Sequence, residues 1–432
     1  MSATAVAVFA LAVIAFVSQS RRLDRAHLTA PIVFTTLGTL IGLLPVGHHV
    51  DESVVHDLAE ITLALVLFHD AAQVRPRQLE SDAGLCARLL LIGLPLTVIA
   101  GYAAARLLYP GAGVWLALLL GASLAPTDAG LGAATVLDPV VPVRVRRILN
   151  VESGLNDGLA TPVVLFAVAA AGGTHVGTVG TIGSAAVELA LGVLIGAVLG
   201  ALTGRVLALT SANRVEPGLL SVATLAVPLA CYFSALVLHG NGFVAAFVSG
   251  TAFGAAAPGL RDGDPTSRQP ALELTAWISV LLGLAVWGLF GVLAVAHLAT
   301  DFTWRTVVFA VASLTVLRML PVALALVGSG MKRPTVAFVG WFGPRGLASV
   351  IFALIAVEAL PMDAALHEVM DTITLTVVLS VVLHGITAEP WARRYGAWAE
   401  RTRPAEELAD SVEPGPGRGR ARRRLSPASS SP

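Results

Sequence analysis

Two carboxylates and an amide lie close together in Val151-Glu152-Ser153-Gly154-Leu155-Asn156-Asp157-Gly158, at the mouth of an apolar segment that continues to Ala171. A charged side chain is costly to keep in hydrocarbon, so a carboxylate in such a segment usually marks an ion or proton pathway, or a partner that neutralises it. The stretch therefore predicts a functional site inside a membrane-spanning helix.

The composition is that of a membrane protein. Of the 432 residues, 56% are hydrophobic and 13% are charged, whereas soluble globular chains carry about 25% charged residues. Apolar runs near the length of a membrane span, about 20 residues, recur from the first residues to about Pro390. These features exclude a soluble globular protein. They predict an all-α polytopic membrane protein whose surroundings are the lipid bilayer and which has no nucleic-acid partner.

Polar residues and Pro/Gly breaks divide the sequence into about thirteen predicted transmembrane helices. They cover residues 3–20, 29–46, 55–74, 86–108, 113–137, 150–171, 178–209, 217–238, 240–258, 273–299, 305–329, 335–360 and 368–390. The predicted transmembrane domain is 1–392. Residues 393–432, rich in Pro, Gly, Ser and Arg, are predicted to form a disordered cytoplasmic tail.

Basic residues are concentrated in every second connection, and the intervening connections hold almost none. Because positive charge favours the cytoplasmic side of a membrane, this pattern predicts a multi-pass protein of the cell (inner) membrane with its N-terminus outside and its tail in the cytoplasm. The basic connections contain Arg21, Arg22, Arg25, Arg75, Arg77, Arg144, Arg146, Arg147, Arg214, Arg261, Arg268, Lys332 and Arg333.

Two of the predicted helices are interrupted. The fifth contains Leu124-Ala125-Pro126-Thr127-Asp128-Ala129-Gly130, in which the proline removes a backbone donor and clashes with the preceding turn. The twelfth contains Gly340-Trp341-Phe342-Gly343-Pro344-Arg345-Gly346. Irregular backbone at membrane depth is tolerated only where it lines a cavity or is buried in protein, so both breaks predict interior positions.

Charged residues of three distant segments are predicted to lie in one layer of the membrane. At a rise of about 1.5 Å per residue, Asp157 lies roughly 10 Å, Asp128 roughly 14 Å and Arg345 roughly 15 Å from the inner face. The interrupted helices are seven apart and therefore antiparallel, as corresponding members of inverted repeats would be. Such paired breaks indicate the midplane site of a transporter, where Arg345 and the carboxylates would offset the partial charges of the helix ends.

These motifs resemble those of bacterial sodium/proton antiporters of the NhaP type, in the cation:proton antiporter-1 family. The resemblance rests on Pro126-Thr127-Asp128, Glu152-Ser153-x-x-Asn156-Asp157-Gly158 and Gly343-Pro344-Arg345-Gly346, and extends to His239-Gly240-Asn241-Gly242-Phe243, Leu317-Arg318-x-x-Pro321 and His384-Gly385-Ile386-Thr387. It covers about residues 5–392. It implies the inverted-repeat antiporter fold, with a dimerisation bundle and a moving core bundle in each protomer of a homodimer.

The resemblance also implies which residues bind the ions. Sodium and a proton would compete at Asp157, and no cofactor is expected besides the transported Na⁺ and H⁺. The cation would be held by side chains of Asp128, Asp157 and Ser153 and by a backbone oxygen near Thr127, with Glu152 close by. Arg345 matches the structural or charge-compensating arginine of the family.

Two roles stay open for Glu152, which is either an ion ligand or a structural partner of Arg345 or Arg318, the two candidate charge-compensating residues. Ser153 is also a candidate cap of a helix turn. A partly buried carboxylate takes up a proton near neutral pH, so a proton and a hard monovalent cation can displace each other there. Asn156 beside Asp157 is neutral, which predicts an electroneutral 1:1 exchange.

The main alternative is another inverted-repeat transporter or channel, for a different ion or a small organic solute. Such a site would need aromatic or several hydrogen-bonding groups, whereas the surroundings of Asp157 are mostly Gly, Ala, Leu and Val. An intramembrane enzyme is not expected, because the sequence has no Gly-x-Ser-Gly nucleophile and no His-Glu-x-x-His helix. The predicted cation is Na⁺, with K⁺ and Li⁺ as alternatives.

Two further patterns predict contacts at the edges of the helices. Gly192, Gly196, Gly200 and Gly204 recur every four residues and predict close helix packing, which makes them a candidate dimer interface. His69-Asp70, near the inner end of the third predicted helix, is interpreted as an interfacial pair, with a pH sensor as the alternative.

Overall fold

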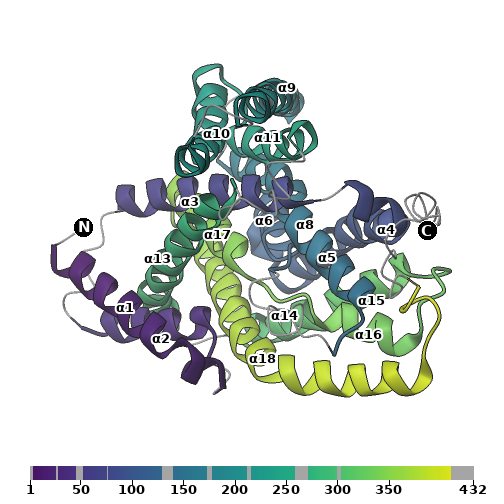
Figure 1. The fold of residues 1–432 in the computed structure, drawn as a ribbon. Helices are drawn as coiled ribbons and strands as arrows, with labels where there is room; N and C mark the ends of the chain where they lie inside the picture. The colour runs from purple at the N-terminus through teal and green to yellow at the C-terminus, as the bar shows by residue number, and fades with distance from the viewer. Residues whose placement is uncertain are drawn as a thin grey trace, which may run out of the picture.

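The structure, a computed structural model, describes residues 3–25, 28–44, 52–74, 76–128, 140–172, 178–211, 216–257, 271–298 and 303–409. In these ranges all regular secondary structure is helical (Figure 1). The helices are α1 (Ala3–Arg25), α2 (Ala30–Gly42), α3 (Glu52–Gln73), α4 (Pro76–Arg88), the π-helix η2 (Leu89–Gly93), α5 (Leu94–Leu108), the 3₁₀ turn η3 (Pro110–Ala112), α6 (Gly113–Ser123), α8 (Val143–Ala171), α9 (Thr178–Ser211), α10 (Pro217–Val237), α11 (Gly242–Ala256), α13 (Glu273–Leu298), α14 (Trp304–Leu314), α15 (Val316–Ala325), α16 (Arg333–Trp341), α17 (Leu347–Ala359) and α18 (Ala364–Thr402).

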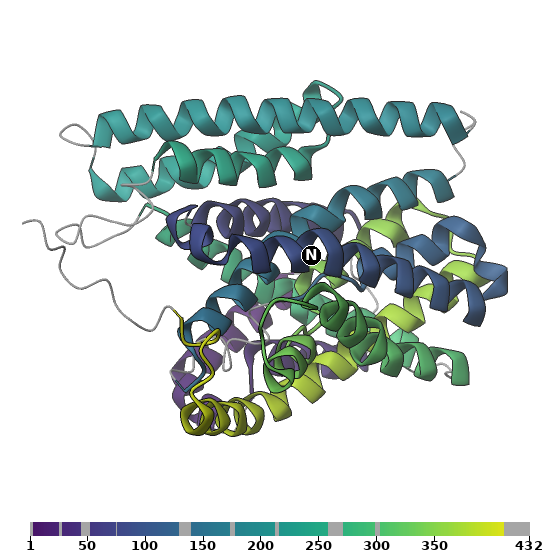
Figure 2. The same ribbon diagram turned by 90° about the vertical axis from the view of Figure 1, so that its right-hand side faces the viewer.

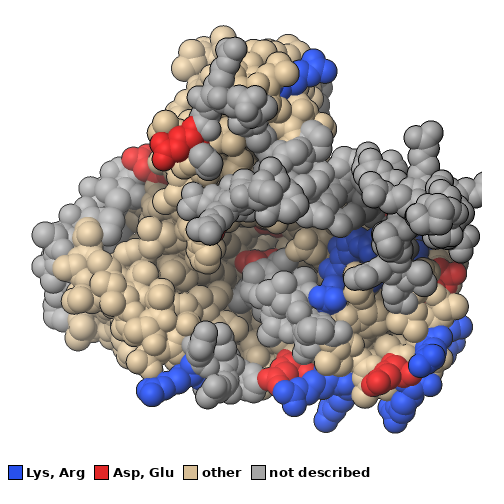
Figure 3. Space-filling view, in the orientation of Figure 1, with Lys and Arg blue, Asp and Glu red and all other residues tan. Residues whose placement is uncertain are grey.

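The predicted all-α membrane class is confirmed. Among the described residues, seven helices are long and apolar enough to cross a membrane, and five shorter helices are also apolar. Figure 3 shows that much of the described surface on this face is uncharged; many of the charged groups lie along its lower edge and right-hand side, and a few lie at the centre and on the upper part. Within the described ranges every predicted span overlaps at least one helix, while the number of thirteen crossings stays a prediction.

Helix starts follow the local sequence. Proline occupies the first turn of α2, α10 and α16, where its missing N–H costs no hydrogen bond. Side chains cap other helices: Asn241 accepts from the backbone N–H of Val244 at 3.0 Å, and Asp363 accepts from that of Leu366 at 2.8 Å. These caps satisfy donors that the first helical turn leaves unpaired.

The helices pack in two groups. In one, α9, α10 and α3 pack against α11, and α13 packs against α2 and α3; α9 crosses one side of the molecule beside α10 and α11 (Figure 2). In the other, α5 packs on α6, α6 on α8, α14 on α18 and α15 on α16. The groups meet where α3 contacts α8 and α17 and where α13 contacts α17 and α18. The dimerisation bundle and the moving core bundle that the resemblance implies stay a prediction.

The glycine stripe of α9 packs within the chain. A Cβ on Gly196 would lie 2.5 Å from the carbonyl oxygen of Ala245, and one on Gly200 would lie 2.5 Å from that of Ser249. Close helix packing is thus confirmed, with α11 as the partner. The interpretation of this face as a dimer interface is wrong, because small residues show that a helix approaches closely but not which chain the helix belongs to.

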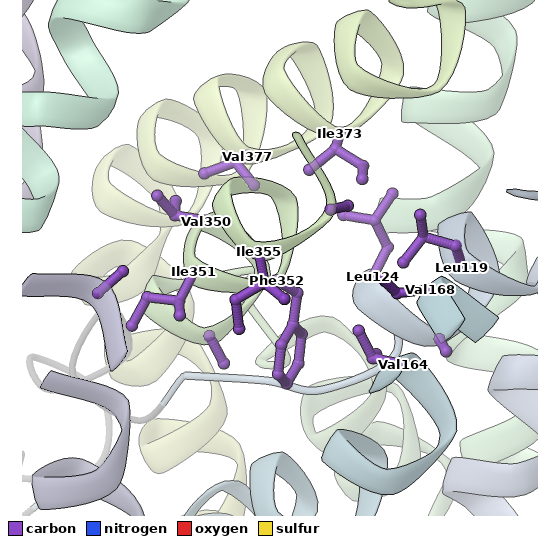
Figure 4. Packing of buried hydrophobic residues seen from close by; sticks show 14 of the residues in the cluster. Leu119, Leu124, Val164, Val168, Val350, Ile351, Phe352, Ile355, Ile373 and Val377 are labelled. Carbon is purple, nitrogen blue, oxygen red and sulfur yellow. The ribbon is translucent and has the colours of Figure 1, made fainter. Parts of the chain in front are cut away.

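An apolar cluster lies beside the interrupted helices. It joins side chains of α6, α8, α17 and α18 (Figure 4). Because lipid tails are as apolar as these side chains, the cluster stabilises the fold through close packing rather than through removal from water. Its labelled members are Leu119, Leu124, Val164, Val168, Val350, Ile351, Phe352, Ile355, Ile373 and Val377.

The chain stays helical beyond the predicted end of its last span. Helix α18 continues to Thr402, so the prediction of a disordered tail beginning at residue 393 is wrong for 393–402. Aromatic stacking orders this extension: the Tyr395 ring lies 4.2 Å from that of Phe338, and the Trp391 ring lies 5.2 Å from that of Trp341. Turns follow to residue 409, and the rest of the predicted tail, 410–432, lies outside the described residues.

Candidate ion site

The fifth predicted helix is interrupted as its sequence indicates. Helix α6 ends at Ser123, and residues 126–128 have no regular structure. Pro126 accounts for this, because it has no N–H to continue the helix. The second half of this predicted helix, 129–139, lies outside the described residues.

The twelfth predicted helix is interrupted between α16 and α17, and the two interruptions cross. The backbone N–H of Asp128 donates to the carbonyl of Pro344 at 2.9 Å. The backbone N–H of Leu347, the first residue of α17, donates to Oδ2 of Asp128 at 3.0 Å. A carboxylate thereby lies at the positive end of α17, where it is stabilising. A Cβ on Gly346 would overlap the Asp128 carboxylate, so the crossing requires glycine there.

Arg345 binds the opposite kind of helix end. Its Nη1 donates to the carbonyls of Ala125 at 2.8 Å and Pro126 at 3.1 Å, just after α6 ends. Its Nη2 donates to the carbonyl of Ser313 at 3.1 Å, and its backbone N–H donates to Oγ of Ser380 at 2.7 Å. The positive charge of Arg345 therefore offsets the negative carbonyl end of α6. The same residue holds the second break against α14 and α18.

Glu152 pairs with Arg318. An oxygen of Glu152 lies 2.7 Å from Nη2 of Arg318, and the two side chains are only 2% and 1% exposed. Arg318 is brought there by a kink at Thr315, which divides the eleventh predicted helix into α14 and α15. Of the partners considered for Glu152, the structure places Arg318 in contact; Arg345 binds backbone carbonyls instead.

The small polar side chains of this layer form a chain of hydrogen bonds. Nδ2 of Asn156 donates to Oγ1 of Thr127 at 2.7 Å, and that oxygen lies 3.1 Å from Oγ of Ser153. These contacts tie α8 to the first break. They also show that the Asn156 amide is directed at Thr127.

A cavity of about 400 Å³ opens beside these groups. Four of the predicted site residues line it: Thr127, Asp128, Ser153 and Asp157. The other four, Asn156, Glu152, Arg318 and Arg345, are not among its lining residues. Oδ1 of Asp157 is buried and has no hydrogen-bond partner among the described residues. Carboxylate, hydroxyl and carbonyl oxygens suit a hard cation. Within the described ranges no cluster of His, Cys, Asp and Glu forms a multidentate metal centre.

Four residues of α3 line the same cavity, and two of them, His69 and Asp70, were not expected there. His69 and Asp70 line it, and a Cβ on Gly154 would lie 3.5 Å from that of Asp70. The structure thus places these residues beside the candidate site, while their position at the membrane interface stays a prediction. The position of Asp70 in its predicted helix could have indicated a place in the site. It stands four residues before the predicted inner end at residue 74, which corresponds to roughly 6 Å into the membrane. That places a third carboxylate near the layer of Asp157.

Comparison with known proteins gives one family over most of the chain. Residues 8–394 match the family described as "Sodium/hydrogen exchanger, transmembrane". The K⁺/H⁺ antiporter NhaP of Alkalimonas amylolytica is 25% identical over 431 residues, which are 96% of this chain and 70% of the relative. A Na⁺/H⁺ antiporter of Schizosaccharomyces pombe is 27% identical over 324 residues, which are 67% of this chain and 66% of the relative. The second relative is thus matched over slightly less than two thirds of its length.

A solved structure shares the fold. The sodium proton antiporter MjNhaP1 of Methanocaldococcus jannaschii, determined at pH 8, superimposes with a TM-score of 0.74, covering 91% of this chain and 98% of the other. At 18% identity, the likeness concerns the arrangement of the helices.

Proposed function

Because the chain belongs to the sodium/hydrogen exchanger family, we propose that it exchanges a monovalent cation for protons across the membrane, with both ions competing for Asp157. The membership agrees with the resemblance seen in the motifs, and it makes the chain a secondary antiporter rather than an enzyme. The proposed cation is Na⁺, with K⁺ or Li⁺ as alternatives.

The observation that carries the proposal is the environment of Asp157. Glu152 is paired with Arg318, and Asp128 accepts from the start of α17. Asp157, in contrast, lines the cavity with one buried oxygen that has no hydrogen-bond partner among the described residues. A buried carboxylate is costly unless something neutralises it, and either a bound cation or a proton does so.

The neighbouring oxygens supply the rest of a cation site. Ser153, Thr127 and Asp128 line the same cavity from α8 and from the first break. Asp70 faces it from α3, in the other group of helices. We propose that cation ligands come from both groups, so that relative movement of the groups exposes the loaded site first to one side and then to the other.

We propose an electroneutral 1:1 stoichiometry. Asn156 next to Asp157 carries no charge, and the Glu152–Arg318 pair is already neutral overall. One cation or one proton on Asp157 therefore moves the same charge in each direction. Transport by the purified protein in vesicles should not respond to an imposed membrane potential, and a clear response would contradict this stoichiometry.

The assembly and orientation are also proposals. We propose a homodimer in the cell (inner) membrane, with the N-terminus outside and the C-terminus in the cytoplasm. The alternation of basic connections supports this orientation. The exposed apolar side chains Leu11, Ile14 and Val17 of α1 suit contact with lipid or with a second protomer. A monomeric mass for the purified protein in mild detergent would contradict the dimer.

Proteoliposomes that contain a pH-sensitive dye test the exchange itself. Addition of an external cation to acid-loaded vesicles should raise the internal pH, with a saturable dependence on cation concentration. Chloride salts of Na⁺, K⁺ and Li⁺ give the cation preference, and protein-free vesicles are the control. If none of the three cations moved protons faster than in the control, the proposed function would be wrong.

A further inference from the structure

Two adjacent glutamates follow the last helix and contact the inner ends of two others. Helix α18 ends at Thr402, and the next residue, Arg403, has left-handed backbone angles and donates its N–H to the carbonyl of Ala399 at 2.9 Å. The chain then turns back beside α15 and α16 (Figure 1). We call residues 403–409 the C-terminal segment; it contains Glu406 and Glu407.

Glu407 caps helix α16. Lys332, the residue before this helix, has no side-chain cap of its own. Instead, Oε1 of Glu407 accepts from the backbone N–H of Lys332 at 2.9 Å and from Oγ1 of Thr335 at 2.6 Å. Glu407 is 1% exposed, and Thr335 also lies 3.0 Å from the hydroxyl of Tyr395. A carboxylate at this end satisfies an unpaired donor and is favoured by the helix dipole.

Glu406 binds the start of helix α8. Its carbonyl oxygen and its Oε2 both accept from Nη1 of Arg144, the latter at 3.1 Å. Nε of Arg144 donates to Oδ1 of Asp82 at 2.7 Å, and Asp82 also pairs with Arg147 at 3.0 Å. Because Arg147 lines the cavity, these contacts run from the C-terminal segment to the mouth of the candidate site.

The two helices held in this way carry the two halves of the site. Helix α16 has nine residues, so its capped end lies roughly 13 Å from the break that contains Arg345. Helix α8 carries Ser153 and Asp157 two to four turns beyond Arg144. Neighbouring residues of one short segment thus fix the inner ends of both helices relative to each other.

We propose that the C-terminal segment is a positioning clamp for the ion site, and that Glu407 sets the apparent affinity for the transported cation by holding α16 in place. This proposal rests on the function proposed above. Cation binding needs the crossed breaks in their native geometry, and apparent affinity falls with the fraction of molecules in the competent state. Loss of one helix cap should therefore raise the cation KM by roughly fivefold, with less change in the maximal rate.

The test compares full-length variants in the dye-loaded proteoliposomes. Glu407→Ala removes the cap, whereas Glu407→Gln keeps an oxygen acceptor and should restore most of the affinity. Thr335→Val, which removes one of the two donors, should shift KM in the same direction as Glu407→Ala. Glu400→Ala is the matched control, because Glu400 is an exposed glutamate on the adjoining part of α18.

Hydrogen exchange of the same preparations separates a lost clamp from a misfolded protein. Faster exchange confined to residues 333–341 in Glu407→Ala, together with the raised KM, supports the clamp. A KM within twofold of the Glu400→Ala value, or a loss of maximal rate at unchanged KM, would overturn it. An absence of cation-driven proton movement in the unmodified protein would instead contradict the proposed function.

Discussion

Removal of either partner of the Glu152–Arg318 pair should destabilise the protein more than removal of both. The two groups are 2.7 Å apart and almost completely buried. Glu152→Gln leaves the guanidinium, and Arg318→Met leaves the carboxylate, as an uncompensated charge in the protein interior. Breaking a buried pair from one side costs about 3–5 kcal/mol, whereas replacing both partners by hydrophobic groups of similar volume is close to neutral. The double change leaves only one uncharged amide without a partner, which costs about 1–3 kcal/mol.

The double variant therefore measures the coupling. If the single losses were independent, the double variant would lose about 6–10 kcal/mol, the sum of two one-sided losses. We expect it to lose less than either single variant, which is a coupling of several kcal/mol. Thermal unfolding in detergent, followed by tryptophan fluorescence, should rank the unmodified protein first, the double variant second and the single variants last. Additive losses would refute the assignment of a buried ion pair.

The same double variant decides the role of Glu152. If Glu152 is purely structural, a folded double variant should retain cation-driven proton movement with a similar cation KM. If Glu152 is an ion ligand, the double variant should fold but transport poorly. We expect transport to be retained, because Arg318 already neutralises the carboxylate and Glu152 does not line the cavity.

The remaining predictions concern three other contacts. Gly346→Ala should destabilise the protein by about 1–3 kcal/mol through overlap with Asp128; Gly84→Ala, whose added Cβ meets nothing within 4 Å, is the control in the same thermal assay. Asp70→Asn should raise the cation KM in proteoliposomes while the protein stays folded, and an unchanged KM would remove Asp70 from the site. Gly196→Val should separate α9 from α11 and lower the unfolding temperature, and full stability would show that this packing adapts easily.

The sequence predicted the two breaks, because a break depends on local rules, whereas the common depth of the charged residues stays a prediction. Pro126 and the Gly343-Pro344 pair each stand beside further polar or glycine residues, and proline weakens a helix because it lacks an N–H. Proline alone does not decide the matter, since Pro162 and Pro390 lie inside the continuous helices α8 and α18. Depth follows from counting residues along a helix of known rise. The crossing of the two breaks, seen in the hydrogen bond between Asp128 and Pro344, fits those estimates.

The neighbours of each side chain were harder to predict than the breaks in the helices. Counting residues does not say which side of a helix faces which neighbour, so Arg318 and Arg345 were equal candidates to pair with Glu152. The kink at Thr315 brings Arg318 to the pair. It could not be predicted, because residue 315 is neither proline nor glycine. Asp70 was missed because its partners lie on helices distant in sequence.

The helical extension of α18 beyond residue 392 could have been predicted from the spacing of its aromatic residues. Trp391, Tyr395 and Trp398 recur at helical spacing and form one aromatic face, which predicts an amphipathic helix. The Pro, Gly, Ser and Arg content of residues 393–432 as a whole suggested disorder instead. The contacts of Glu406 and Glu407 depend on where this helix ends, and only the three-dimensional arrangement supplies that.

The central claim is that the cation and the proton compete for Asp157. Its most direct test is the pH-dye assay in proteoliposomes with Asp157→Asn, compared with Asp57→Asn, which changes an exposed aspartate of α3, and with the unmodified protein. Asparagine keeps the size of the side chain but neither binds a proton nor neutralises a cation. We predict that Asp157→Asn folds and shows no cation-driven proton movement, while Asp57→Asn transports normally. Undiminished proton movement in folded Asp157→Asn would contradict the account.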